Sequence, residues 1–366
     1  MALQCGILGL PNAGKSTLFN ALTASDVPAE SYPFCTIDPN VGIVPVPDAR
    51  LAVLERIFQP GKVTPAVVEF VDIAGLVRGA SKGEGLGNQF LAHIRATDAL
   101  VHVVRCFEDS EVTHVEGSLD PVRDAQIIET ELLLKDLESL DRRTQRAAKG
   151  ARSGEKSAAS ELAVLERLTA ALDAGQMARS VPLNDGEQAL VRQLNLLTFK
   201  PILYVANVDE GEIQRKERGP LPTALAEFAA AEGNTFIRLC GQIEQEIAVL
   251  EGDEQSDFLA EYGLPEPGLD KLIHAAYALL RYQTFFTGSS KEVRAWTVAA
   301  GATAPQAAGV IHSDFQRGFI KAEVFSYDDL LRLGSEQALK EAGLVRQEGK
   351  EYRVREGDVI FFKFNV

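Results

Sequence analysis

Nine consecutive residues near the start of the chain carry the chemistry of a phosphate-binding loop. Residues 9–17 read Gly-Leu-Pro-Asn-Ala-Gly-Lys-Ser-Thr, which matches the pattern G-x-x-x-x-G-K-[ST] without a mismatch. The glycines let backbone N–H groups turn inward around phosphate oxygens, while Lys15 can reach the β- and γ-phosphates and Ser16 can offer its hydroxyl to Mg²⁺. Lys15 is also expected to assist catalysis. The expected phosphate-binding residues are Asn12, Ala13, Gly14, Lys15, Ser16 and Thr17.

Two further motifs indicate a nucleotide-dependent switch. The sequence Asp-Ile-Ala-Gly at 72–75 ends an apolar strand, where Asp72 can hold Mg²⁺ through water and Gly75 can present its N–H to the γ-phosphate. Thr36 lies in the proline-rich loop before that strand, and its hydroxyl can complete the Mg²⁺ shell only while the γ-phosphate is bound. Each motif alone is common, but their order after the phosphate loop favours a switch NTPase.

The sequence Asn-Val-Asp-Glu at 207–210 stands where a base-reading loop belongs, directly after an apolar strand. Guanine readers use N-K-x-D, in which the short Asp takes the guanine N1–H and 2-amino group together while the Lys stem packs on the ring. Here Val208 replaces the Lys and Glu210 replaces the Asp. Glu is one methylene longer, and each buried polar group left unpaired costs about 1–3 kcal/mol. We therefore expect ATP to be preferred over GTP, with Asn207, Val208 and Glu210 at the base.

Hydrolysis needs a group that orients water. Leu76 follows Asp-Ile-Ala-Gly at the position where many switch GTPases carry Gln, so another residue must serve. His114, in the polar loop 108–117, is the best candidate, although a histidine that is simply exposed to solvent is the ordinary alternative. Asn12 could give an oxygen to K⁺ beside the phosphates or could merely suit the loop geometry, and hydrolysis rates in K⁺ and Na⁺ would distinguish these roles.

The elements that must position these residues alternate between strand and helix. This alternation predicts an α/β fold with a mostly parallel sheet, whose ligands bind at the carboxyl ends of the strands. The expected strands are 3–8, 67–72, 99–104, 201–206 and 235–239, and the expected helices are 16–22, 51–57, 88–97 and 221–231.

Two regions depart from this pattern. From about 128 to 180, leucines at helical spacing on both sides of a turn at 150–154 predict an antiparallel helical hairpin inserted into the α/β domain. From about 281, the chain has the mixed pattern of a small α+β domain. Its expected strands are 295–298, 318–324, 352–354 and 359–364.

Basic residues gather in both regions, and either group could contact RNA or could be an ordinary solvated surface. Because the whole chain has a net charge of −15, contact with RNA would have to come from these local patches. The hairpin group is Arg142, Arg143, Arg146, Lys149, Arg152 and Lys156, and the C-terminal group is Arg281, Lys291, Arg294, Arg317 and Lys321.

The composition bounds the remaining possibilities. A chain of 366 residues, 46% apolar and 24% charged, is typical of a soluble protein with two or three domains. It has no apolar run near the roughly 18 residues of a membrane span, and its N-terminus lacks a signal-peptide pattern. The four cysteines are far apart and form no C-x-x-C pair, which indicates reduced thiols. We therefore expect a cytoplasmic protein with no membrane partner.

Six stretches carry a resemblance to a known family: 9–17, 34–39, 72–88, 207–210, 291–297 and 305–312. Together they resemble the YchF subfamily of Obg-like P-loop NTPases, and the likeness covers essentially the whole chain. It implies an α/β P-loop NTPase domain at 1–280 with a helical coiled-coil arm inserted at about 128–180, and a ubiquitin-like β-grasp TGS domain at 281–366. It also implies hydrolysis of ATP, with weaker use of GTP, and association with the ribosome, where we expect the large subunit and rRNA as partners.

The resemblance carries roles over by position: phosphate binding by 12–17, Mg²⁺ binding by Ser16 and Thr36, base contacts by Asn207 and Glu210, and catalysis by His114. The family's Ser-Ala base motif appears here as Cys240-Gly241, and backbone groups of this loop could still contact the base. Two alternatives stay open. One is a GTP-using translational switch, and the other is a nucleotide-gated RNA- or ribosome-binding module whose turnover is incidental.

Overall fold

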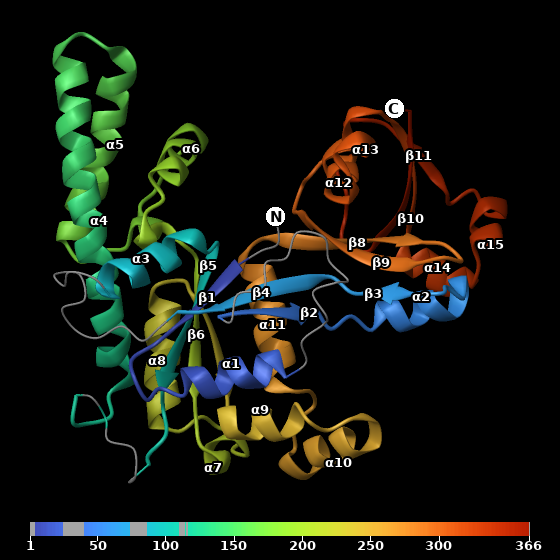
Figure 1. Ribbon diagram of the computed structural model, residues 1–366, viewed down its shortest axis with the longest axis horizontal. Coiled ribbons are helices and arrows are strands. Elements are labelled where there is room, and N and C mark those ends of the chain that lie inside the picture. Colours follow the sequence, from blue (N-terminus) through green and yellow to red (C-terminus); the bar gives the residue numbers. More distant parts are fainter. Residues whose placement is uncertain (1–3, 25–39, 74–85, 110–113, 115, 366) are drawn as a thin grey trace. The chain divides into compact units, whose positions relative to one another are not determined.

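The computed structural model describes residues 4–24, 40–73, 86–109, 114 and 116–365. The expected switch residues Thr36, Gly75 and Leu76 lie outside these ranges. The chain forms two compact units (Figure 1). The first comprises Met1–Gly42 and Glu69–Leu272, and the second comprises Ile43–Val68 and Ile273–Val366.

One six-stranded sheet has the order β2-β4-β1-β5-β6-β7, and all its strands except β2 lie mainly in the first unit. The pairs β1–β4, β1–β5, β5–β6 and β6–β7 are all parallel, which confirms the expected α/β fold. All residues of β5 and β6 are buried, and this is why both strands read as continuous apolar runs. The strands are β1 (Gln4–Leu8), β2 (Val41–Pro45), β4 (Val67–Asp72), β5 (Ala99–Arg105), β6 (Ile202–Asn207) and β7 (Thr235–Leu239).

Helices join consecutive parallel strands of this sheet, as parallel pairing requires, and three more helices follow β7. They are α1 (Lys15–Thr23), α3 (Leu86–Ala96), α4 (Pro121–Arg152), α5 (Lys156–Asp173), α6 (Asp185–Leu194), α7 (Glu210–Ile213), α8 (Pro220–Ala231), α9 (Gly241–Ile247), α10 (Gly252–Tyr262) and α11 (Gly268–Leu279). In the described part of the chain, none of the helices combines the length and the apolar character of a membrane span.

The helical arm is the antiparallel pair α4 and α5, which lie side by side in Figure 1. Helix α4 begins at Pro121 rather than near residue 128, because the Asp120 side chain caps it by accepting a hydrogen bond from the backbone N–H of Arg123 at 3.0 Å. The first turns of α4 place Ile128 and Leu132 in the main core, whereas Leu140, farther along, packs against the leucines of α5. One continuous helix therefore runs from the main core of the first unit into the arm.

The second unit contains the other six-stranded sheet, in the order β11-β10-β12-β8-β9-β3. The hairpin β8–β9 is followed by helix α12 and then by β10, β11 and β12, with β12 parallel to β8, which is the expected β-grasp arrangement. The elements are β8 (Tyr282–Gly288), β9 (Val293–Ala299), α12 (Ala304–Ile311), α13 (Ser313–Arg317), β10 (Phe319–Ser326), α14 (Tyr327–Leu333), α15 (Glu336–Glu341), β11 (Arg346–Glu348) and β12 (Asp358–Phe364).

The two units do not follow the expected division into 1–280 and 281–366, because residues 43–68 belong to the second unit. Strand β3 (Val63–Thr64) pairs in parallel with β9, and the Thr64 hydroxyl donates to the Glu292 carboxylate at 2.7 Å. Helix α2 (Arg50–Phe58) contributes Phe58, whose ring occupies the space beside Gly288. The expected strand at 352–354 was wrong, since only an isolated bridge between Arg353 and Thr303 forms there.

Candidate nucleotide-binding site

The phosphate loop connects β1 to α1, as its flanking residues predict. Asn12 and Gly14 adopt left-handed φ angles of 66° and 85°, which reverse the chain before the helix. Gly9 cannot carry a side chain, because a Cβ there would lie 2.5 Å from the Val103 carbonyl oxygen. Gly14 is the N-cap of α1 and no described side chain caps this helix end, so its first N–H groups can bind an anion.

Lys15 and Asp72 form an ion pair beside this loop. Parallel pairing of β1 with β4 brings the ends of both strands together, with Ile7 opposite Asp72. The Lys15 and Asp72 side chains are 10% and 21% exposed, so the two charges are largely shielded from water. The Lys15 ammonium thus lies beside the phosphate loop with the Asp72 carboxylate as its partner.

Asn207 holds two loops of the site together. Its Nδ2 donates to the Ala13 carbonyl oxygen at 3.0 Å, and its Oδ1 accepts from the backbone N–H of Gly241 at 2.9 Å. These partners lie in the phosphate loop and in the turn after β7. The sequence placed Asn207 at the base, but it did not reveal that both ends of the amide are used to fix the phosphate loop against the Cys240-Gly241 turn.

The other expected base residues occupy different environments. Val208 is 2% exposed and belongs to the main hydrophobic core, so its side chain does not line the surface of the site. Cys240 is also buried, and burial raises the pKa of its thiol above the ordinary value. The Cys240 thiol is therefore enclosed by the protein, and contacts from this segment to a base remain an expectation for its backbone groups.

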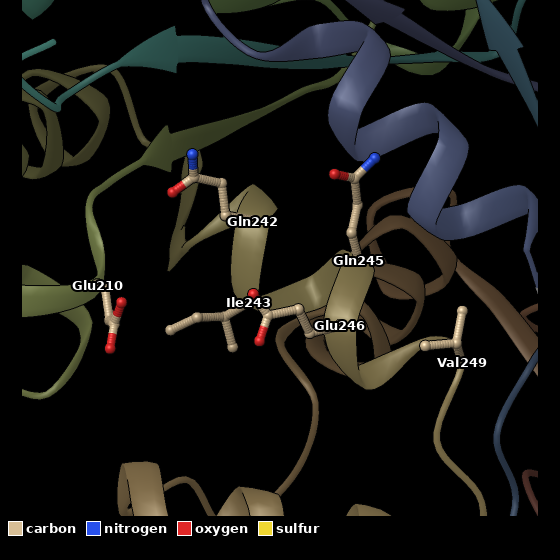
Figure 2. Close-up of a pocket in the computed structure, with 6 residues that line it drawn as sticks. All are labelled: Glu210, Gln242, Ile243, Gln245, Glu246 and Val249. Atoms are coloured by element: carbon tan, nitrogen blue, oxygen red, sulfur yellow. The ribbon is translucent and has the colours of Figure 1, made fainter.

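Glu210 stands at the edge of an open hollow of about 460 Å³. Figure 2 shows Glu210 on one side and the side chains of α9 and the residue Val249 on the other. The Tyr262 hydroxyl donates to Glu210 Oε1 at 2.9 Å, while the preceding Asp209 caps α7 by accepting from the N–H of Glu212 at 2.8 Å. The lining residues are Glu210, Gln242, Ile243, Gln245, Glu246 and Val249.

His114 lies beside the phosphate loop and is not an ordinary solvent-exposed histidine. It lines a cavity of about 10 Å³, large enough for about one water molecule, together with Leu10, Pro11 and Ala13. Its Nδ1 accepts from the N–H of Glu116 at 3.1 Å, so a neutral ring carries its proton on Nε2. Nε2 lies 2.7 Å from Oδ2 of Asp124 on α4, and this distance fits a hydrogen bond to the carboxylate.

His102 lines the same cavity from strand β5 but is 1% exposed and structural. Burial, followed by the positive charge of Arg179, lowers the pKa of His102 to about 3. The ring is therefore neutral at physiological pH, and its centroid lies 5.4 Å from that of Tyr204. Tyr204 in turn donates to Glu129 of α4 at 2.5 Å, which anchors the base of the arm to the sheet.

This shifted pKa predicts a specific loss of stability in acid. The pKa of His102 in the folded state is below its unfolded value near 6.5. The contribution of the buried neutral ring to the free energy of unfolding is therefore fully present above pH 6.5 and is lost as pH falls toward 3. Between pH 7.5 and pH 5, we expect wild type to lose about 2 kcal/mol more of its free energy of unfolding than His102→Phe does. Urea unfolding at both pH values measures this, and equal losses for the two proteins would contradict the assignment.

The donor set near the phosphate loop suits Mg²⁺. Ser16, exposed in the first turn of α1, and Asp72, at the end of β4, both offer hard oxygen ligands. Among the described residues, no group of three or more His, Cys, Asp or Glu side chains could hold a metal ion. Mg²⁺ in proteins usually keeps several waters and binds one or two protein oxygens together with phosphate oxygens. When bound, Mg²⁺ would neutralise charge on the β- and γ-phosphates.

Two residues of the site carried no sequence signal. Asp124 reads as an ordinary acidic residue in the first turn of a helix, and Tyr262 as the last residue of another helix. Asp124 contacts His114 and Tyr262 contacts Glu210, and in each pair the partner lies outside the helix that carries the acting residue. Periodicity within one helix therefore could not identify either residue.

A phosphate loop at the end of β1, an ion-paired Lys15 and Asp72, and an Asn207 clamp define a P-loop NTPase of the GTPase-like fold. Sequence models agree: one described as a 50S ribosome-binding GTPase matches residues 4–136, and one for the C-terminal region of YchF GTPases, described as a protein of unknown function, matches 282–365. The chain belongs to the YchF family.

Full-length relatives support this assignment. The chain is 54% identical to the "Ribosome-binding ATPase YchF" of Haemophilus ducreyi, 53% to that of Bacillus subtilis and 51% to that of Escherichia coli O157:H7, each over 100% of both chains. The solved structure of the Schizosaccharomyces pombe YchF GTPase is 38% identical, with a TM-score of 0.89 over 99% of this chain and 97% of that one.

Proposed function

We propose that this protein is a Mg²⁺-dependent nucleoside triphosphatase that binds and hydrolyses ATP in preference to GTP and acts at the ribosome. The observation that carries the nucleotide preference is the position of Glu210 at the edge of the hollow beside α9. A carboxylate only accepts hydrogen bonds, and adenine presents an amino donor at C6 where guanine presents a carbonyl oxygen. The relatives named ATPases support the same reading.

The chain's own residues divide the work of hydrolysis. Backbone N–H groups of the phosphate loop and the Lys15 ammonium bind the phosphates, while Ser16, Asp72 and Thr36 would hold Mg²⁺. Gly75 would offer its N–H to the γ-phosphate. Asn12, with its left-handed backbone in the loop, remains the candidate ligand of a K⁺ ion.

His114 is the proposed water-orienting residue, and Asp124 positions it. In the structure both ring nitrogens have partners, the backbone of Glu116 and the carboxylate of Asp124. For His114 to orient water, Nδ1 must release the Glu116 N–H while Asp124 retains Nε2. Asp124 suits this role because it is 4% exposed and Arg123 donates to its other oxygen at 2.9 Å.

The proposal that the ribosome is a partner rests on the names of the relatives and on the exposed basic residues of the arm. All six basic residues of the hairpin group are exposed, although Arg143 also pairs with Glu161. In the C-terminal group, Arg294 lies over the Trp296 ring and Arg317 pairs with Asp314, so part of that charge is used inside the unit. We therefore propose the arm as the main contact with rRNA of the large subunit.

Titration of nucleotide-free protein with ATP and GTP, in Mg²⁺ and K⁺, tests the nucleotide preference. We expect ATP to bind at least about tenfold more tightly than GTP, which corresponds to roughly one charge-assisted hydrogen bond. Replacing Glu210 with Ala should remove most of the difference, while Glu217→Ala, on an exposed segment after α7, should not change it. Tighter GTP binding would instead support the GTP-using translational switch.

Sedimentation and turnover measured with ribosomes distinguish an ATPase switch from the second alternative, a nucleotide-gated binding module. An ATPase switch should show turnover that changes when ribosomes are added, and its binding should weaken with salt. Turnover unaffected by ribosomes would favour a nucleotide-gated binding module.

A further inference from the structure

Tyr262 contacts Glu210, which lines the open hollow beside α9, and its own surroundings fix its position. It is the last residue of α10, and its ring stacks on that of Phe258 with centroids 4.8 Å apart and planes inclined by 29°. Both rings also pack against the main core. The hydroxyl group therefore has a defined position, from which it donates to Glu210 Oε1 at 2.9 Å.

Glu210 itself is exposed and occupies the first turn of the short helix α7. An exposed Glu normally samples many rotamers, so that ordering its carboxylate on ligand binding has an entropic cost. The bond from Tyr262 removes part of this freedom before the nucleotide arrives. The carboxylate also raises the pKa of Tyr262, so the phenol keeps its proton and remains the donor.

The same bond makes the two carboxylate oxygens unequal. Oε1 already accepts from Tyr262, so the two oxygens are no longer equivalent acceptors. Guanine offers two adjacent donors, N1–H and the 2-amino group, which are best matched by two equivalent oxygens. Adenine offers one donor group at C6, which one oriented oxygen can satisfy.

We propose that Tyr262 is a specificity-determining residue, which positions Glu210 to accept a single hydrogen bond from the 6-amino group of a purine nucleotide. This inference rests on the proposed ATP preference and names a residue on which that preference depends. In this proposal Tyr262 acts through Glu210.

The test combines Tyr262→Phe with three nucleotides: ATP, GTP and the triphosphate of purine riboside, which lacks the 6-amino group. Phe retains the ring that stacks on Phe258 and removes only the hydroxyl group. We expect the Kd for ATP to rise about five- to tenfold, the effect of one charge-assisted hydrogen bond, while the Kd for purine riboside triphosphate stays within about twofold. The matched control is Tyr327→Phe, which removes a half-buried tyrosine hydroxyl in the second unit and should leave all three values unchanged.

A double variant, Tyr262→Phe with Glu210→Ala, provides a second measurement. If Tyr262 acts through Glu210, the hydroxyl deletion should have little further effect once the carboxylate is gone. Equal weakening of all three nucleotides by Tyr262→Phe, or an additive effect in the double variant, would overturn the inference and leave the ATP preference intact. A wild-type protein that does not prefer ATP would instead overturn the proposed function on which this inference rests.

Discussion

Replacing His114 with Ala should lower kcat for ATP hydrolysis by about a hundredfold or more, the usual contribution of a positioned acid–base group. The Kd for ATP should stay within about twofold, because His114 lies beside the phosphate loop and its hydrogen bonds go to Asp124 and the Glu116 backbone. Single-turnover hydrolysis and equilibrium titration measure the two constants separately.

Asp124→Asn is the companion variant, because it keeps the shape of the side chain and removes the charge that faces His114 Nε2. We expect an intermediate loss of about tenfold in kcat, since Asn can still accept from the ring through its amide oxygen. Asp141→Asn, exposed on the arm, is the matched control and should hydrolyse ATP at the wild-type rate. An unchanged kcat in His114→Ala would contradict the proposed catalytic role of His114, and another group would have to orient the water.

Gly14→Ala should abolish nucleotide binding, with affinity for ATP and GTP falling together by about a hundredfold or more. A left-handed φ of 85° alone costs an alanine about 1–2 kcal/mol. In addition, its Cβ would overlap Nδ2 of Asn207, the atom that donates to the Ala13 carbonyl. The hydrogen bond from Asn207 to Ala13 must then break, or the phosphate loop must move. Either change disturbs the backbone N–H groups that would bind the phosphates of both nucleotides.

Gly154→Ala separates backbone strain from this collision. Gly154, in the turn of the arm, has nearly the same φ of 88°, but a Cβ there would have no heavy atom within 4 Å. We expect this variant to lose about 1 kcal/mol of unfolding free energy and to bind both nucleotides normally. Titration with fluorescent ATP and GTP analogues compares the two variants, and normal binding by Gly14→Ala would show that the clamp is dispensable.

Local patterns predicted much of the fold. The phosphate loop lies within nine consecutive residues, so its glycines and flanking periodicities were visible together. Strand β4 at Val67–Asp72 and strand β7 at Thr235–Leu239 have the predicted bounds. Strand β8 was missed, because its seven residues mix Thr, Gln and Gly with two buried Phe residues and show no clean alternation.

The sequence by itself determined the class of protein, the order of its motifs and the existence of the arm. Each of these depends on residue types at short spacings along the chain. The tertiary structure decided which distant residues meet. It joined 43–68 to the C-terminal sheet through β3 and buried Val208 in the core. It also paired His114 with Asp124 and Glu210 with Tyr262. These contacts arise from strand order and helix packing, which bring together residues that no local spacing relates.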